Sequence, residues 1–143
     1  AALKDEGLDL AFWKIALRPG KPLMFGRLEG TRVLGLPGNP VSALITARVF
    51  LAPLIKALLG EAYAAGAMET AILAKPIEAN GPRLHLMRAK LGRDGDGTLV
   101  VTPLPSQDSS LLSALAKADC LIRRLPGAPA AHAGEPVPVE RLD

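Results

Sequence analysis

Aromatic side chains are scarce in this chain of 143 residues, at 3% of the composition, whereas hydrophobic residues make up 49%. The core must therefore be built mainly from Leu, Val, Ile and Ala. Too few rings are present to stack nucleic-acid bases and no basic helix is evident, so we predict no nucleic-acid partner. The single cysteine, Cys120, cannot form an internal disulfide and lies in an apolar stretch. We expect a buried, unreactive thiol there, as is common in a reducing, cytoplasmic protein.

Several functional motifs are also missing. No apolar run reaches 18 residues without a charge, so the sequence predicts no membrane span. There is no phosphate-loop lysine motif, no dinucleotide fingerprint and no recognisable Ser, His and acid set. Two histidines, His85 and His132, lack metal-ligand partners at a useful spacing, so we expect one in a strand and the other in a loop. The run Asp94–Gly97 lacks the later Glu of a calcium loop and predicts a hairpin turn.

Positive charge is concentrated in the first part of the chain, although the net charge is only +3. Residues 1–60 carry eight bases and four acids, whereas residues 61–143 carry nine bases and ten acids. Between residues 10 and 32 the only acid is Glu29, and the bases are Lys14, Arg18, Lys21, Arg27 and Arg32. This segment is the candidate region for binding an anion.

Residues Phe12–Arg18 are predicted to form a strand, and strand alternation would then place Lys14 and Arg18 on one face. Two cations on one face can grip a phosphorylated ligand, with the Arg as a planar fork and the Lys as a point charge. The alternative is a solvated edge strand that is protected by its charge.

The stretch Gly35–Ala43 contains two glycines, two prolines and an Asn, so the backbone conformation of the turn that it forms is tightly restricted. A buried strand is predicted before it and a long apolar helix after it. Asn39 is a natural N-cap and Pro40 suits the first helical position. We expect unpaired N–H groups at this helix start to attract an anion, phosphate above all, unless the turn is only an ordinary capped helix start.

The remaining pattern predicts two parts of different texture. Strands are expected at residues 22–28 and 31–36, joined by a Glu29–Gly30 turn. The helix should end near Leu59, with Gly60 as its stop, and Pro53 should either kink it or begin a second helix. After a small-residue linker, five short strands suggest a barrel or sandwich. They are predicted at Met68–Leu73, Leu84–Leu91, Thr98–Pro103, Cys120–Leu125 and Pro136–Arg141, with a short helix at Leu111–Lys117 capped by Asp108 or Ser109.

The order and spacing of four motifs strongly resemble the molybdopterin molybdenumtransferases, the MoeA-type proteins equivalent to the E domain of gephyrin. The motifs are Phe12-Trp13-Lys14, Arg18-Pro19-Gly20-Lys21-Pro22, Phe25-Gly26 and Gly35–Ala43. A weaker likeness continues through Gly81-Pro82-Arg83, Arg88 and Gln107-Asp108-Ser109. The likeness covers only the C-terminal third of such a protein. It implies an α/β segment followed by a small all-β barrel: residues 1–62 would finish a molybdopterin-binding α/β domain, 63–67 would be a linker, and 68–143 the barrel.

The resemblance also implies the chemistry. Members of that family insert molybdenum from molybdate into adenylylated molybdopterin and release AMP, with a divalent metal such as Mg²⁺. Catalytic positions then fall on Lys14 and Arg18. Substrate-binding positions fall on Lys21, Pro37, Gly38, Asn39, Pro40, Arg88 and Ser109. Without the resemblance, Arg88 would be read as a strand-surface cation and Ser109 as a helix cap.

The same resemblance places the Mg²⁺ ligands and a glycine-rich segment upstream of Ala1. We therefore expect the chain to be inactive alone, and the full-length protein to be a homodimer. Residues Ala1–Gly7 look like the last turns of a helix closed by glycine, which also suggests a fragment. Two other functions stay open: a pterin-binding or protein-interaction (scaffold) module without turnover, and a general domain that binds phosphorylated metabolites.

Overall fold

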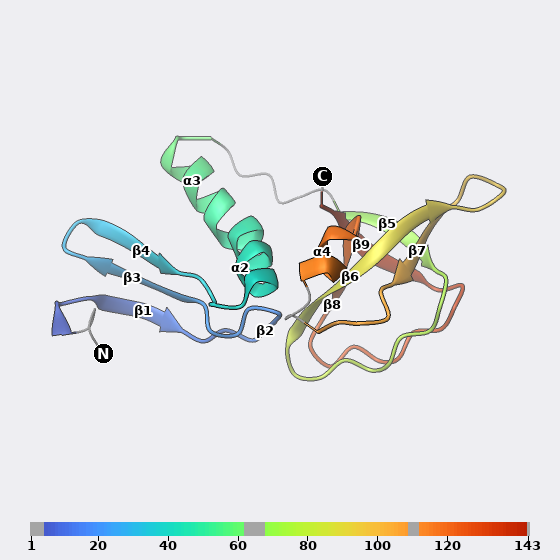
Figure 1. Ribbon diagram of the computed structural model, residues 1–143, viewed down its shortest axis with the longest axis horizontal. Coiled ribbons are helices and arrows are strands. Elements are labelled where there is room, and N and C mark those ends of the chain that lie inside the picture. The colour runs from blue at the N-terminus through green and yellow to red at the C-terminus, as the bar shows by residue number, and fades with distance from the viewer. Residues whose placement is uncertain (1–4, 62–67, 109–111, 143) are drawn as a thin grey trace. The chain divides into compact units, whose positions relative to one another are not determined.

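The computed structural model describes residues 5–61, 68–108 and 112–142, and it divides into two compact units, Ala1–Tyr63 and Ala64–Asp143 (Figure 1). The division falls at the start of the stretch predicted to be a linker. Residues 62–67 lie outside the described part, so the linker itself stays a prediction. Each unit is considered below by itself.

Unit 1 contains an antiparallel sheet in the order β1-β3-β4, formed by Asp9–Trp13, Met24–Leu28 and Thr31–Gly35. The predicted turn Glu29–Gly30 joins β3 to β4, and Glu29 has a left-handed φ of 52°. Both predicted strands are thus confirmed with slightly shorter bounds. The predicted strand Phe12–Arg18 is wrong as one element, because β1 ends at Trp13 and the two-residue β2, Leu17–Arg18, begins only after a break.

The predicted long helix is confirmed, with an irregular centre. It consists of α2 (Pro40–Thr46), a π-helical turn η1 (Ala47–Leu51) and α3 (Ala52–Leu58). Pro53 has no N–H to donate to the preceding turn, and the wider π-helical turn directly before it accommodates that loss. Gly60, with a φ of 78°, follows the last turn as predicted.

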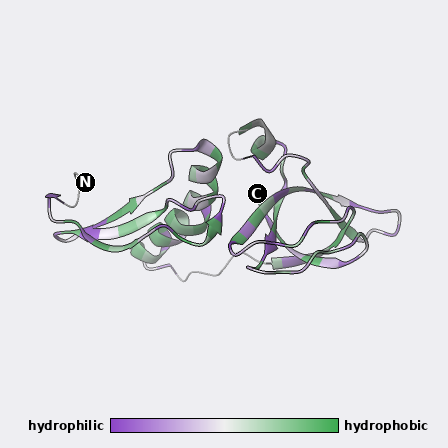
Figure 2. Ribbon diagram, turned by 90° about the horizontal axis from the view of Figure 1, so that it is seen from below, coloured by the Kyte–Doolittle hydropathy of each residue, from purple (hydrophilic) through white to green (hydrophobic). Residues whose placement is uncertain are grey.

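The stretch Pro40–Leu58 is long and apolar enough to cross a membrane, judged by length and composition only (Figure 2). Core helices of water-soluble proteins meet the same criterion. Arg48 and Lys56 lie within the stretch, and Leu44, Ile55 and Leu58 are among its exposed side chains. The absence of a membrane partner therefore stays a prediction.

Unit 2 is a small barrel. Within its described residues, β5 (Met68–Leu73), β6 (Leu84–Arg93), β7 (Leu99–Pro103), β8 (Cys120–Arg124) and β9 (Pro136–Arg141) follow the order β6-β7-β5-β9-β8. The long strand β6 closes the sheet, because its first half pairs with β8 and its second half with β7. All five predicted strands are confirmed, as is the short helix α4 (Leu112–Ala116), whose cap lies outside the described residues.

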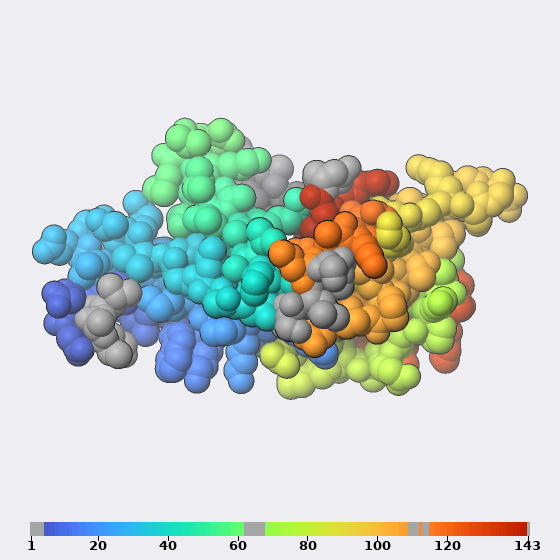
Figure 3. Space-filling view, viewed as in Figure 1, coloured from blue at the N-terminus to red at the C-terminus, as the bar shows by residue number. Residues whose placement is uncertain are grey.

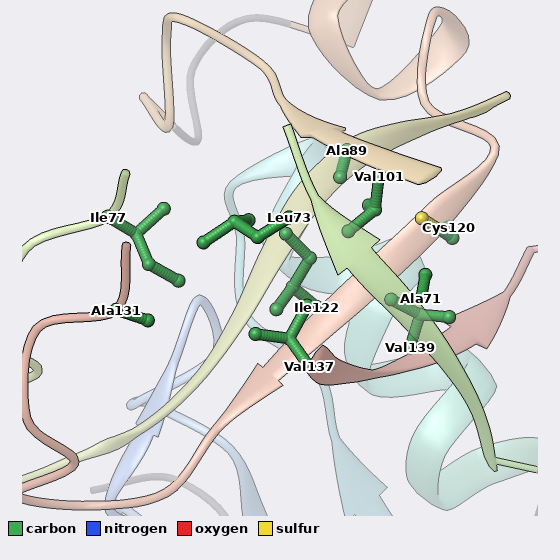
Figure 4. Packing of buried hydrophobic residues seen from close by; sticks show 10 residues of the cluster. All are labelled: Ala71, Leu73, Ile77, Ala89, Val101, Cys120, Ile122, Ala131, Val137 and Val139. Atoms are coloured by element: carbon green, nitrogen blue, oxygen red, sulfur yellow. The ribbon is translucent and has the colours of Figure 1, made fainter. Parts of the chain in front are cut away.

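The core of the barrel consists of small and aliphatic side chains, as the shortage of aromatics requires (Figure 4). Its buried members are Ala71, Leu73, Ile77, Ala89, Val101, Cys120, Ile122, Ala131, Val137 and Val139. Cys120 is fully buried, and burial raises the pKa of its thiol to about 12. The prediction of a buried, unreactive thiol is therefore confirmed in its structural part.

The remaining local predictions for unit 2 also stand. His85 lies in β6 and His132 lies in a loop. Asp94–Gly97 forms the turn between β6 and β7, where the Asp94 carboxylate accepts bonds from the backbone N–H groups of Asp96 and Thr98. This hairpin end projects from unit 2 as the yellow lobe at the upper right of Figure 3.

Candidate oxyanion site

The three predicted basic residues of unit 1 lie on the segment between β1 and β3, which includes the two-residue β2. The N–H of Lys14 donates to the carbonyl of Leu23 at 3.0 Å, and that of Ile15 donates to the carbonyl of Lys21 at 2.9 Å. These bonds close the loop, and the side chains of Lys14, Arg18 and Lys21 are all exposed on it. The structure thus brings the three cations onto one segment, which we call the basic loop (residues 14–23).

Lys14 does not follow the strand alternation that the sequence pattern predicts. Its backbone has a left-handed φ of 66°, which is uncommon for a residue with a side chain. The extended strand is broken there, so the prediction that Lys14 and Arg18 share one strand face is wrong. The Lys14 ammonium instead lies over the indole ring of Trp13, with Nζ 4.1 Å from the ring centroid.

The basic loop packs against α2 through Gly20. A Cβ atom at this glycine would lie 2.4 Å from Cγ2 of Thr46 and 3.1 Å from Cδ2 of Leu17. Gly20 also has a φ of +121°, a conformation that glycine adopts readily and other residues rarely do. The loop and the turn before α2 lie at the same end of unit 1 (Figure 1).

The turn before α2 has the predicted cap. Asn39 is the N-cap, and its side chain accepts a bond from the N–H of Ser42 at 3.2 Å. The N–H of Ala43 donates to the carbonyl of Asn39, and Pro40 has no N–H. The cap satisfies the N–H of Ser42 and the proline has none to offer, so anion binding at this helix start stays a prediction.

The neighbouring turn residues differ in exposure. Pro37 is buried, whereas Gly38 and Pro40 are exposed. The φ of Gly38 lies outside the left-handed range, and a Cβ atom there would meet nothing within 4 Å. Gly38 is thus not required by the backbone shape of the turn.

In unit 2, Arg88 is buried, with 1% of its surface exposed, so the reading of it as a surface cation is wrong. It lies on β6 next to Ala89 of the core, and alternation places it on the opposite face of that strand. Its guanidinium donates to the carbonyl of Asp108 at 3.1 Å. Ser109, the other predicted barrel residue, lies outside the described part of the chain.

Gln107 fastens the loop that follows β7 onto β6. Its side-chain oxygen accepts from the N–H of Arg88 at 3.0 Å, and its side-chain nitrogen donates to the carbonyls of Arg88 at 2.9 Å and Leu104 at 3.0 Å. The amide therefore acts as a substitute strand partner at Arg88. Sequence reasoning noted Gln107 only within a motif and missed this role, since nothing in the local pattern shows which backbone a side chain bonds.

The barrel also carries a patch with two arginines, but the positive charge of one of them is paired with a carboxylate. A shallow depression of about 210 Å³ is lined by Leu91, Gly92, Arg93, Leu99 and Arg141. The Arg141 guanidinium bonds Glu69, with Nε 2.5 Å from Oε1, and this hydrogen bond lowers the pKa of the Glu69 carboxyl. The basic loop is a better candidate, because Lys14 has no carboxylate partner among the described residues.

The resemblance places the ligands of the divalent metal upstream of Ala1, and the described residues offer no alternative set. They contain no group of three or more His, Cys, Asp or Glu side chains that could hold an ion. Mg²⁺ takes oxygen ligands, mainly carboxylates, phosphates and water, and no step in the function proposed below passes through a metal on this part of the chain.

Comparisons with known proteins cover both units. Residues 1–57 match the profile of a probable molybdopterin binding domain, and residues 70–142 match that of the MoeA C-terminal region (domain IV). The chain is 38% identical over 141 residues to the molybdopterin molybdenumtransferase of Haemophilus influenzae, covering 98% of this chain and 35% of that protein. The chain belongs to the molybdopterin molybdenumtransferase family.

Other proteins of the molybdopterin molybdenumtransferase family are also similar to this chain. Molybdopterin molybdenumtransferase 1 of Mycobacterium tuberculosis is 36% identical over 135 residues, which cover 90% of this chain and 32% of that protein. The crystal structure of a molybdopterin biosynthesis MoeA protein from Pyrococcus horikoshii superposes with a TM-score of 0.79 at 25% identity, covering 99% of this chain and 34% of that one. The chain thus spans about a third of the length of these relatives.

Proposed function

We propose that this chain is the part of a molybdenum-inserting transferase that binds the anionic groups of the substrates. The full reaction would take molybdate and adenylylated molybdopterin, attach molybdenum at the dithiolene and release AMP. The family membership and the names of the relatives support the reaction class. The basic loop supports the role of this chain within it.

The observation that carries the proposal is the exposure of Lys14, Arg18 and Lys21 on one loop closed by backbone hydrogen bonds. Phosphoanhydride cleavage and transfer of an oxyanion both develop negative charge that fixed cations stabilise. Arg18 supplies a planar donor fork, whereas Lys14 and Lys21 supply point charges. The turn Pro37–Pro40 would shape the edge of the same site, while a substrate-binding role of Arg88 and Ser109 in the barrel stays a separate prediction from the resemblance.

Removal of one cation tests this role. We expect Lys14→Ala to weaken adenylylated molybdopterin binding about 10- to 100-fold, since a charged hydrogen bond contributes roughly 1.5–3 kcal/mol. A direct calorimetric titration measures the change. Lys56→Ala, which removes an exposed cation from α3 of the same unit, is the matched control and should bind as the unsubstituted chain does. Equal affinities of the two variants would reject the role of Lys14.

A second function, binding without turnover, is favoured by one observation: the described residues offer no metal-binding cluster. In that case the chain would act as a pterin-binding or scaffold module. An assay of AMP release by a protein that contains this chain separates the two proposals. A homodimer of the full-length protein, a cytoplasmic location and the absence of a nucleic-acid or membrane partner remain predictions.

A further inference from the structure

Trp13 presents an indole ring at the entrance to the basic loop. It is the last residue of β1, it is 58% exposed, and it is the only tryptophan of the chain. The Lys14 Nζ atom lies 4.1 Å from the ring centroid. This is within the roughly 6 Å over which the electron-rich face of an aromatic ring attracts a cation.

Two constraints together fix where the Lys14 ammonium lies. The backbone is held in the left-handed conformation, with the N–H of Lys14 bonded to the carbonyl of Leu23. The side chain still has several rotatable bonds beyond Cα, and an exposed lysine normally samples many rotamers. The ring of Trp13 provides the second constraint at the far end of the side chain.

The contact leaves the charge available. A carboxylate partner would neutralise the ammonium, but among the described residues Lys14 pairs with none. A ring face attracts the ammonium but carries no net charge that would neutralise it. The N–H donors that point away from the ring therefore remain able to meet an anion.

We propose that Trp13 is a positioning residue for Lys14, and that its ring holds the ammonium ready for a tetrahedral oxyanion. This rests on the proposed oxyanion role of the basic loop. The oxyanion is either a phosphate group of the substrate or molybdate, because both offer the same tetrahedral set of acceptor oxygens. Ordering the ammonium before binding reduces the entropy lost on binding, which strengthens the complex.

Phe12 provides a matched control on the same strand. Its ring packs against that of Phe25, with centroids 6.0 Å apart, and it is partly exposed. Phe12→Leu therefore removes an aromatic ring adjacent to Trp13 without removing the one that contacts Lys14. Trp13→Phe keeps a weaker ring face, whereas Trp13→Leu removes it.

The test uses the chain with its lysines converted to ¹³C-dimethyl-lysine, a modification that keeps the positive charge. Ring currents should shift the Lys14 methyl signal upfield, and Lys14→Arg assigns that signal by removing it. We expect the shift to vanish in Trp13→Leu, to shrink in Trp13→Phe and to persist in Phe12→Leu. Calorimetric titration of the unmodified chains with inorganic phosphate and, separately, with molybdate then gives the dissociation constants.

Trp13→Leu should raise the dissociation constant about two- to fivefold, with Trp13→Phe between it and the unsubstituted chain. A response to only one of the two anions identifies the source of the oxyanion and supports the proposal. If the unsubstituted chain binds an anion and Trp13→Leu binds it equally well, the positioning role is overturned while the proposed function stands. If the unmodified, unsubstituted chain binds neither anion, both are overturned.

Discussion

Gly20 lets the basic loop approach α2, and no other residue could take its place without a local shift. Two separate obstacles oppose a side chain there: the φ of +121°, and Thr46 Cγ2, which a Cβ atom would approach to 2.4 Å. We expect Gly20→Ala to lower the free energy of unfolding by about 1–3 kcal/mol, through strain and overpacking. Urea unfolding followed by circular dichroism measures this loss.

Gly38→Ala is the control for that substitution. Gly38 lies outside the left-handed region and has open space where the Cβ atom would be. Its substitution should change the free energy of unfolding by no more than about 0.5 kcal/mol. Equal losses in the two variants would contradict the packing assigned to Gly20.

Cys120 makes the stability of the barrel depend on alkaline pH. Burial raises the pKa of its thiol in the folded state to about 12, whereas the pKa of a thiol in the unfolded chain is about 8.5. Above that pH the unfolded state loses a proton that the folded state keeps, so unfolding becomes more favourable. We expect the contribution of Cys120 to fall by up to about 1.4 kcal/mol per pH unit, until the pH passes about 12.

The comparison with Cys120→Ala isolates that effect, because this variant lacks the ionisable thiol while the other alkaline groups remain. Its free energy of unfolding should decline less steeply above about pH 8.5 than that of the unsubstituted chain. Parallel declines between about pH 8 and pH 11 would show that the thiol ionises equally in both states.

At the scale of elements, the loop after β7 depends on one side chain for its attachment to β6. Gln107 makes three hydrogen bonds to the backbone of Arg88 and Leu104. We expect Gln107→Ala to reduce the free energy of unfolding by about 1–3 kcal/mol, because it leaves backbone groups at a buried strand position without their partners. Thermal or urea unfolding checks this. Ser106→Ala, in the same loop, should have little effect.

The sequence predicts most of the elements because their patterns are local. Alternation and turn residues are sufficient for β3, β4 and all five barrel strands, and Asn39-Pro40 correctly marks the start of α2. Lys14 shows where such reasoning fails. Its left-handed backbone comes from the closure of the basic loop by bonds to Lys21 and Leu23, which are several residues away.

In the candidate site, too, the local sequence predicts some features and not others. The cations of the basic loop can be identified from charge alone, and Asn39 from its capping chemistry. The burial of Arg88 cannot, since it depends on the loop that Gln107 fastens over β6. The contact between Trp13 and Lys14 is equally invisible to strand alternation, which would have placed two adjacent side chains on opposite faces.

For the whole molecule, we propose that the chain supplies cations for substrate binding and that the metal ligands lie in another part of the full-length protein. The chain spans about a third of its relatives, and its described residues hold no cluster of carboxylates. Fixed cations can stabilise the negative charge of the substrates, but a divalent ion needs oxygen ligands from elsewhere. We therefore expect turnover only when this chain is joined to the remaining two thirds of a family member.

The most direct measurement is AMP release from adenylylated molybdopterin in the presence of molybdate and Mg²⁺. A chimera in which this chain replaces the matching region of the Haemophilus influenzae protein should release AMP, and its Lys14→Ala variant should release it at least about tenfold more slowly at limiting substrate. The chain alone should release none above background. A folded chimera without activity, or equal release by the chain alone, would contradict the proposed function.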